Sequence, residues 1–155
     1  MQFASSLLII AMLAAQATAG FGGRCIRVVD GDTLDVQVGN EVRRVRLAGI
    51  DAPEKNQPFG LESKAYLEAH AVLKEVILPA EMRDRYGRWV SDVILPGNRS
   101  LSRGSLRWGF SWEYKAYSKD PKLASLEATA RKEKRGLWSV TKPIPPWDWR
   151  RGKRS

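Results

Sequence analysis

Three short apolar runs, separated by turn-forming residues, occupy residues 23–47 and constrain the fold more than any other feature of the sequence. In the second and third runs apolar residues alternate with polar ones, which is the period of a strand with one buried face. Asp30-Gly31-Asp32 separates the first run from the second, and Gly39-Asn40 is a two-residue connection of the hairpin type between the second and the third. The sequence therefore predicts a three-stranded meander.

The middle of the chain adds one helix and two strands. Apolar residues at helical spacing predict a helix over Gly60–Lys74, one face of which can pack on the sheet. Two further strands are expected over Val76–Met82 and Trp89–Leu95, on either side of the turn Asp84-Arg85-Tyr86-Gly87.

The last third of the chain is helical again. A short helix that contains Gly104 is expected over Ser100–Trp108. A second helix is expected over Pro121–Arg135, with Asp120 as its capping residue and Gly136 as the left-handed residue that ends it. Five strands with about three helices predict the α+β class, in the form of a five-stranded Greek-key β-barrel of the OB type.

The first nineteen residues differ from everything that follows. Met1–Ala19 carries no charge, and its apolar stretch runs into Ala17-Thr18-Ala19, the small-x-small pattern of signal peptidase sites. This predicts a signal peptide cleaved before Gly20, with export to the periplasm or the medium. The apolar run is shorter than the roughly 20 residues of a membrane span. Because the leader has no Lys or Arg, an uncleaved membrane anchor stays open as the alternative.

Behind the leader we expect a single domain and a short tail. Residues 20–142 are close to the usual size of one domain and contain no internal repeat. Residues 143–155 form a Pro- and Trp-rich, basic C-terminal tail. Within it, residues 143–149 are expected to lie against the barrel, and residues 150–155 to be flexible and to add electrostatic attraction.

Charge and residue counts narrow the function classes. The chain has 26 Lys and Arg against 17 Asp and Glu, a formal net charge of +9 that suits a polyanion, an anionic membrane or solubility alone. Its one Cys and one His exclude an internal disulfide, thiolate or multi-histidine zinc sites and a two-histidine ribonuclease mechanism. His70 is expected to be an ordinary helix residue and Cys25 an inert thiol. Any catalysis must rest on carboxylates and arginines.

Ionisable residues crowd into two turns, in the segments DGDT (residues 30–33) and RLAGIDAPE (residues 46–54). Taken singly, each of them fits a solvated turn. Asp32 and Asp51, however, stand at the ends of adjoining predicted strands. Two carboxylates with a main-chain carbonyl and water make an oxygen-rich site suited to a hard divalent cation such as calcium, with modest affinity.

These two segments, followed by DRYGR at residues 84–88, resemble the motifs of the staphylococcal nuclease (thermonuclease) family. The resemblance covers roughly Gly23 to Trp138 and includes QPFG at residues 57–60, the aromatic segment 108–117 and the closing GLW at residues 136–138. It implies an SNase-like OB-fold domain that hydrolyses phosphodiester bonds of DNA and/or RNA. The implied enzyme is a calcium-dependent endonuclease that works by metal-assisted attack of water.

The same resemblance implies a metal site. Asp32 and Asp51 match the calcium-binding carboxylates. Ala52 matches the position that supplies a main-chain carbonyl, where the archetype has a threonine. A carbonyl ligand does not depend on the side chain, so this departure leaves the implied Ca²⁺ site intact.

Three further residues match catalytic positions. Glu54 matches the acid that orients or deprotonates the attacking water. Arg46 and Arg88 match the phosphate-binding arginines, whose guanidinium groups can donate paired hydrogen bonds as negative charge builds up in the transition state. Softer substrate-binding roles, with core packing an equal alternative for the tyrosines, fall to Arg85, Tyr86, Tyr114 and Tyr117. Structural roles are expected for Trp108, Trp112 and Trp138.

Two other functions compete with an active nuclease. One is a catalytically inactive OB-fold module that binds nucleic acid or protein, which would not need the acidic residues and arginines together. The other is a basic surface protein for anionic lipid or polysaccharide, which would not explain the carboxylates. The expected partner is the DNA and/or RNA substrate. No stable protein partner is implied, and a monomer without membrane association after cleavage is expected.

Overall fold

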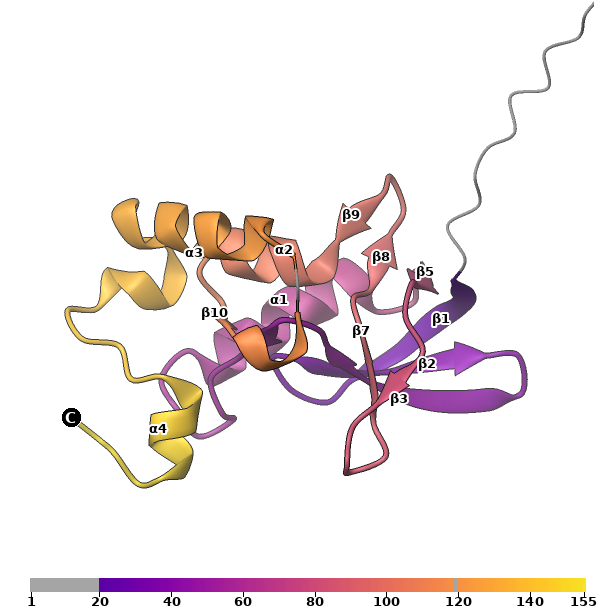
Figure 1. Ribbon diagram of the computed structural model, residues 1–155, viewed down its shortest axis with the longest axis horizontal. Helices are drawn as coiled ribbons and strands as arrows, with labels where there is room; N and C mark the ends of the chain where they lie inside the picture. The colour runs from indigo at the N-terminus through magenta and orange to yellow at the C-terminus, as the bar shows by residue number, and fades with distance from the viewer. Residues whose placement is uncertain (1–19, 119) are drawn as a thin grey trace, which may run out of the picture.

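A meander of three antiparallel strands opens the fold, as the sequence predicts (Figure 1). The computed structural model describes residues 20–118 and 120–155. The three strands are β1 (Phe21–Val28), β2 (Thr33–Val38) and β3 (Glu41–Leu47). The hairpin between β2 and β3 turns at Gly39, whose φ of 57° lies in the left-handed region that favours glycine. The turn fixes the register in which Thr33 faces Arg46.

Short strands extend this meander into one sheet with the order β6-β7-β3-β2-β1-β5-β8-β9. The added strands are β5 (Glu75–Leu78), β6 (Met82–Arg83), β7 (Trp89–Ser91), β8 (Ile94–Leu95) and β9 (Arg99–Ser100). A second, two-stranded sheet joins β4 (Ile50–Asp51) to β10 (Trp112–Glu113). The α+β class is confirmed, and the architecture is consistent with the predicted OB-type fold. In the described part of the chain, β6 and β9 are the end strands of the larger sheet.

The two strands predicted after the first helix are interrupted, so the prediction of continuous strands is wrong. Val76–Met82 divides into β5 and β6 around Pro79, which has no N–H to donate to a sheet. Trp89–Leu95 divides into β7 and β8 at Asp92, whose carboxylate accepts a hydrogen bond from the N–H of Val93. Such local side-chain bonds compete with the ladder of a continuing strand.

Three helices form where the sequence predicts them, although two of these end early, and a fourth forms in the C-terminal tail, where none was predicted. They are α1 (Gly60–Ala71), α2 (Leu101–Arg107), α3 (Lys122–Lys132) and α4 (Pro146–Arg150). Leu73 and Lys134 adopt φ values of 62° and 52°, which stop α1 and α3 before the predicted ends. Gly136, expected to end the helix, instead begins the 3₁₀ turn η2 (Gly136–Ser139). Asp120, the predicted capping residue, instead precedes the N-cap residue Pro121, and its carboxylate accepts a hydrogen bond from the N–H of Lys122.

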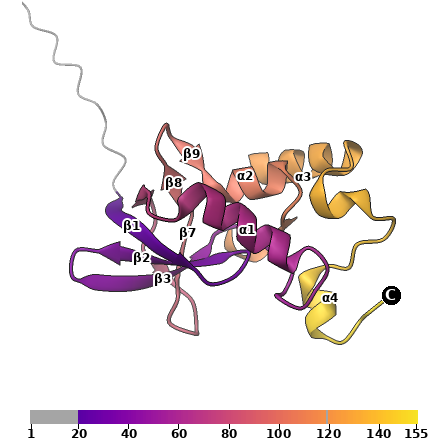
Figure 2. The same cartoon turned by 180° about the vertical axis from the view of Figure 1, so that it is seen from behind.

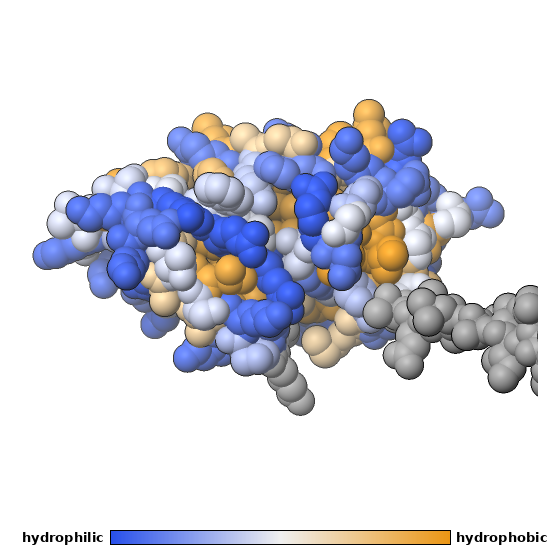
Figure 3. All heavy atoms as spheres, turned by 90° about the horizontal axis from the view of Figure 1, so that it is seen from above, coloured by the Kyte–Doolittle hydropathy of each residue, from blue (hydrophilic) through white to orange (hydrophobic). Residues whose placement is uncertain are grey.

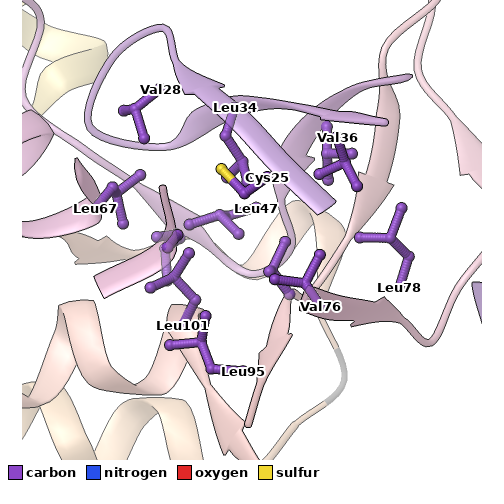
Figure 4. Packing of buried hydrophobic residues seen from close by; sticks show 14 of the residues in the cluster. Cys25, Val28, Leu34, Val36, Leu47, Leu67, Val76, Leu78, Leu95 and Leu101 are labelled. Carbon is purple, nitrogen blue, oxygen red and sulfur yellow. The ribbon is translucent and has the colours of Figure 1, made fainter. Parts of the chain in front are cut away.

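The main core lies between the large sheet and helices α1 and α2 (Figure 4). Leu34 and Leu47 of the sheet, Leu67 of α1 and Leu101 of α2 are fully buried. Burial of each such side chain contributes roughly 1.5–3 kcal/mol relative to an exposed one. Figure 2 shows α1 crossing the sheet on the side of β1, which is how its apolar face reaches this core.

Cys25 and His70 behave as the sequence predicts. Cys25 is fully buried in the core, and burial raises the pKa of its thiol to about 11, so that the thiol is protonated and inert at neutral pH. His70 lies on α1 with its ring 4.2 Å from that of Tyr66, centroid to centroid. Its Nδ1 is 2.7 Å from the carbonyl oxygen of the same tyrosine, the contact of an ordinary helix residue.

A second, aromatic cluster joins the C-terminal elements. Trp112 and Trp138 are buried, with ring centroids 4.4 Å apart in an edge-to-face arrangement, and Trp147 of α4 packs against them. Their predicted structural role is confirmed. The prediction is wrong for Trp108, which is 51% exposed and has the guanidinium of Arg135 at 4.8 Å from its ring centroid. The end of α2 turns this side chain away from the core.

The predicted signal peptide, residues 1–19, lies outside the described residues. Within the described ranges, every helix is too short or too polar to cross a membrane.

A buried carboxylate between two arginines ties the meander together. Asp35 on β2 faces Arg27 on β1 and Arg44 on β3 in the strand register. Its carboxylate accepts hydrogen bonds from Arg27 Nη2 at 2.6 Å and from Arg44 Nε at 2.9 Å. The hydrogen bonds from Arg44, together with those from Arg27, lower the pKa of Asp35 although burial opposes the shift. This ion pair network therefore stabilises the ionised form of Asp35.

We predict that Asp35→Asn lowers the free energy of unfolding by about 1.5–3 kcal/mol at pH 7, the range for hydrogen bonds to a charged group. A lowered pKa in the folded state stabilises the protein above the ordinary Asp pKa of about 3.9, and this contribution is lost as the pH falls through the folded pKa. The difference between parent and variant should therefore shrink below about pH 4. Urea unfolding across this range measures both effects.

Glu41→Gln is the matched control, since Glu41 forms an exposed ion pair with Arg43 on the same hairpin. It should cost less than about 1 kcal/mol. Equal losses in the two variants would contradict the special role of Asp35.

Candidate functional site

One cavity of about 310 Å³ collects all of the predicted site residues except Tyr117. The predicted residues in its lining are Asp32, Arg46, Asp51, Ala52, Glu54, Arg85, Tyr86, Arg88 and Tyr114. Asp30, Pro53 and Arg150 also line it. The side chain of Tyr117 lies outside what the structure describes. Segments that are far apart in the sequence therefore line the same cavity.

Strand pairing brings Asp32 next to Asp51. The N–H of Leu47 donates to the carbonyl oxygen of Asp32 at 2.8 Å, which continues the β2–β3 ladder to that residue. The chain reverses at Gly49, where φ is 75°, and enters the short strand β4 that ends at Asp51. The N–H of Ala52 then donates to the Asp32 carboxylate at 3.0 Å. The two predicted metal-binding carboxylates thus lie in one corner of the cavity.

These carboxylates are buried and repel one another. Asp32 is 8% exposed and Asp51 2%. Burial raises the pKa of Asp51 and the charge of Asp32 raises it further, whereas Arg150 and Arg46 act to lower it. Burial also raises the pKa of Asp30 to about 6, and the charge of Asp32 adds to this shift. Burial and mutual repulsion both disfavour the ionised carboxylates here, and a bound cation would stabilise them.

Arg46 is a buried arginine held by its own turn. Its Nη1 donates to the carbonyl oxygens of Leu47 and Ile50, both at 2.6 Å. Its Nη2 lies 3.5 Å from Asp51 Oδ1 and 3.8 Å from Asp32 Oδ2. The guanidinium group therefore fixes the reversal between β3 and β4 and compensates part of the carboxylate charge.

Glu54 is positioned by the segment that follows it. Its N–H donates to Gln57 Oε1 at 3.0 Å, and its carbonyl oxygen accepts from the N–H of Gln57 at 2.9 Å. Helix α1 starts against this loop, so closely that a Cβ on Gly60 would clash with the carbonyl oxygen of Glu54. The glycine of the QPFG segment is thus explained by the close approach of the helix to the loop.

Arg88 enters the cavity from the turn between β6 and β7. Its N–H and Nε both donate to the carboxylate of Asp84, at 3.0 Å and 2.7 Å. These bonds lower the pKa of Asp84, although burial opposes the shift. Strand β7 runs parallel to β3, with Val90 opposite Arg46, and this pairing brings the turn to the cavity. Arg46 and Arg88, the two predicted phosphate-binding arginines, therefore line the same cavity.

The softer predicted residues form part of the rim. Tyr86 is 69% exposed, and the guanidinium carbons of Arg85 and Arg88 lie 5.1 Å and 5.6 Å from its ring centroid. Tyr114 lies between the cavity and α4, with its ring centroid 6.0 Å from that of Trp147 at an interplanar angle of 30°. Tyr86 is thus open to a ligand, whereas Tyr114 both lines the cavity and packs on a neighbour.

Arg150 is the site residue that the sequence interpretation missed. We expected it to belong to a flexible basic tail, and this is wrong, because Arg150 is the last residue of α4 and forms ion pairs with Asp51 and Glu54. It lies far beyond the motifs in the chain, so no local pattern could have indicated it. The Pro- and Trp-rich stretch before it was the available signal, since it predicted a segment lying against the barrel.

The donor set fits an oxygen-preferring divalent cation. Among residues 20–118 and 120–155, no three His, Cys, Asp or Glu side chains are grouped as metal ligands. A cation would therefore rest on Asp32, Asp51, main-chain oxygen such as the Ala52 carbonyl, and water. Hard oxygen ligands of this kind suit calcium or magnesium and do not suit softer metals.

Several known proteins are similar in sequence to this chain over most of its length. The family model described as staphylococcal nuclease homologue matches residues 44–140. An uncharacterized endonuclease of Escherichia coli O157:H7 is 42% identical over 135 residues, which cover 87% of this chain and 88% of the relative. A micrococcal nuclease of Shigella flexneri is 35% identical over 157 residues, covering 95% and 90% of the two chains. An uncharacterized endonuclease of Haemophilus influenzae is 38% identical, covering 95% and 83%. The chain belongs to the staphylococcal nuclease family.

Proposed function

We propose that this protein is an exported, calcium-dependent nuclease that hydrolyses phosphodiester bonds of DNA and/or RNA. The observation that carries the proposal is the single cavity in which buried carboxylates stand opposite arginines on separate turns. Relatives named endonuclease and micrococcal nuclease support it. A module that only binds nucleic acid has no use for the buried, mutually repelling acids, which raise the cost of folding.

The arginines supply the phosphate contacts. The guanidinium of Arg88 is held through Nε by Asp84, an arrangement that fixes the group without using its terminal nitrogens. A fixed guanidinium can donate two parallel hydrogen bonds to the phosphate oxygens. Because negative charge on these oxygens increases in the transition state, Arg46 and Arg88 stabilise that state more than the bound substrate.

Glu54 acts on the attacking water. Its carboxylate is half-exposed at the cavity, while its backbone is held by Gln57. A carboxylate in this place can orient a water molecule and accept its proton as the bond to phosphorus forms. General base catalysis of this kind contributes about 10²–10⁴-fold to a rate.

Asp32, Asp51 and the main-chain carbonyl of Ala52 would hold the calcium ion. When bound, the ion supplies Lewis-acid stabilisation of charge on a phosphate oxygen. The buried position of both carboxylates strengthens their attraction for a cation, because the surroundings screen charge less than water does.

Nucleic acid as substrate fits the surface of the protein. Hydrophilic side chains are spread over the face shown in Figure 3, among smaller apolar areas, and the chain has a net charge of +9. Positive charge attracts the phosphate backbone irrespective of sequence. Exposed Tyr86 offers an aromatic face on which any base can stack. These features favour binding with little sequence preference, and the leader at residues 1–19 supports export.

We predict that Glu54→Gln lowers the cleavage rate by about 10²–10⁴-fold, the contribution of general base catalysis, while the variant still binds substrate. Plasmid, linear single-stranded DNA and RNA are incubated with the protein in calcium or in a calcium chelator, and cleavage is followed on gels. Glu62→Gln on α1 is the matched control and should cut like the parent. Cleavage that ignores the chelator, or a Glu54→Gln variant as active as the parent, would contradict the mechanism.

We predict that Arg88→Lys lowers turnover by about 10²-fold or more, as the loss of a fixed donor to transition-state charge does. Lysine keeps a positive charge near Asp84 but cannot donate paired hydrogen bonds to phosphate. The melting temperature should change little, so turnover and thermal unfolding are measured together. Arg99→Lys, on β9 and away from the cavity, serves as control. A variant that matches the parent in turnover would show that Arg88 does not contact the phosphate.

A further inference from the structure

Helix α4 is docked beside the cavity by contacts that involve no charge. The ring of Trp147 lies 5.7 Å from that of Trp112, centroid to centroid, within the aromatic cluster. The segment before the helix is fixed by Gln57, whose Nε2 donates to the carbonyl oxygen of Ile144 at 2.6 Å. Figures 1 and 2 both show α4 next to the loop between β4 and α1. The helix is therefore held in place independently of its terminal arginine.

This docking places Arg150 on the two acids of the loop. Its Nη2 donates to Asp51 Oδ2 at 2.8 Å, and its Nη1 lies 3.3 Å from Asp51 Oδ1. The same Nη1 donates to Glu54 Oε1 at 2.8 Å. One guanidinium group thus bridges the proposed metal ligand and the proposed base. The family model ends its match at residue 140, so this arginine lies beyond the matched span.

We propose that Arg150 sets the metal affinity of the site, because its guanidinium group takes the place of a cation at Asp51 in the metal-free protein and competes with the incoming ion. The inference rests on the proposed function, since it takes Asp51 as a metal ligand. Binding of the divalent ion then requires Arg150 to release Asp51, and the free energy of that ion pair is subtracted from the free energy of metal binding.

The physical reason for this competition is that the guanidinium group of Arg150 contacts both carboxylate oxygens of Asp51. The Asp51 side chain is 3% exposed, so water screens its interactions weakly. A divalent ion coordinated by the same carboxylate would lie close to the guanidinium group and be repelled by it. Arg46 lies farther from Asp51, at 3.5 Å, and is fixed by carbonyl oxygens, so it cannot leave as Arg150 can.

A latch that only holds the C-terminal segment is the other explanation for the same ion pair. The anchors of α4 at Trp147 and Gln57 already hold that segment. A latch would moreover work with any surface acid, whereas Arg150 contacts the most buried acid of the cavity. The two explanations differ in one measurable quantity, the affinity of the protein for calcium.

The test measures calcium binding directly, by isothermal titration calorimetry with calcium chloride at pH 8. Arg150→Gln is compared with the parent and with Arg151→Gln, which removes the same charge from the adjacent residue. Arg151 is a suitable control because its guanidinium pairs with Asp148 of the same helix. We expect Arg150→Gln to bind calcium about tenfold more tightly than the parent, the factor that loss of a charged hydrogen bond represents. Arg151→Gln should bind like the parent.

Thermal unfolding gives a second measurement that does not depend on activity. The ion pair stabilises the metal-free protein, so calcium should raise the melting temperature of Arg150→Gln more than that of the parent. Arg150→Lys keeps the charge but loses the paired geometry, and its calcium affinity should lie between those of the parent and Arg150→Gln.

Each other outcome overturns the inference. Equal or weaker calcium binding by Arg150→Gln would show that the ion pair is a latch and would leave the proposed nuclease function standing. Equally tightened binding in the Arg150 and Arg151 variants would show a general effect of net charge. Failure of both the parent and Arg150→Gln to bind calcium would refute the calcium site itself, and with it the calcium dependence of the proposed function.

Discussion

The buried guanidinium group of Arg46 is the interaction on which the cavity depends. It binds the carbonyl oxygens of the reversal between β3 and β4 and faces both Asp32 and Asp51. Without it, two acids would be buried against each other with too little compensation, which is a costly state. Strand β3 provides this arginine, the β6–β7 turn provides Arg88, and α4 provides Arg150. The charge balance of the cavity therefore links three parts of the fold that are not adjacent in sequence.

Much of the fold, and the grouping of the acids and arginines of the cavity, could be predicted because turn residues and short sequence motifs indicate them. The turn residues at 30–32 and 39–40 predicted the meander. The hairpin register then pairs Thr33 with Arg46, which brings the side chain of Asp32 within 3.8 Å of that arginine. Motifs that resemble a known family supplied the remaining pairings, such as that of Asp32 with Asp51. Strand continuity could not be predicted in the same way. At Pro79 and Asp92, a missing donor and a competing side-chain acceptor outweigh the apolar pattern that indicated longer strands.

Arg150 shows the limit of such prediction. It acts on Asp51 from 99 residues away in sequence, and its own surroundings are a run of basic residues typical of solvated tails. The packing of Trp147 into the aromatic cluster and the hydrogen bond from Gln57 to Ile144 position α4 so that this one arginine, and not its neighbour Arg151, reaches the cavity. Packing of the Trp147 ring thus places a positive charge, the guanidinium group of Arg150, in the cavity. Residue type gave no indication of this, whereas tertiary packing does.

The buried thiol of Cys25 has a consequence for how the protein responds to oxidants. A thiol with a pKa of about 11 is thiolate in only about one molecule in 10⁴ at pH 7, and disulfide exchange and oxidation by peroxides proceed through the thiolate. The sheet and α1 also shield the sulfur from any partner molecule. Cross-linking of two chains through this cysteine would require the core to open first. The stability of the core therefore also protects the thiol from oxidation.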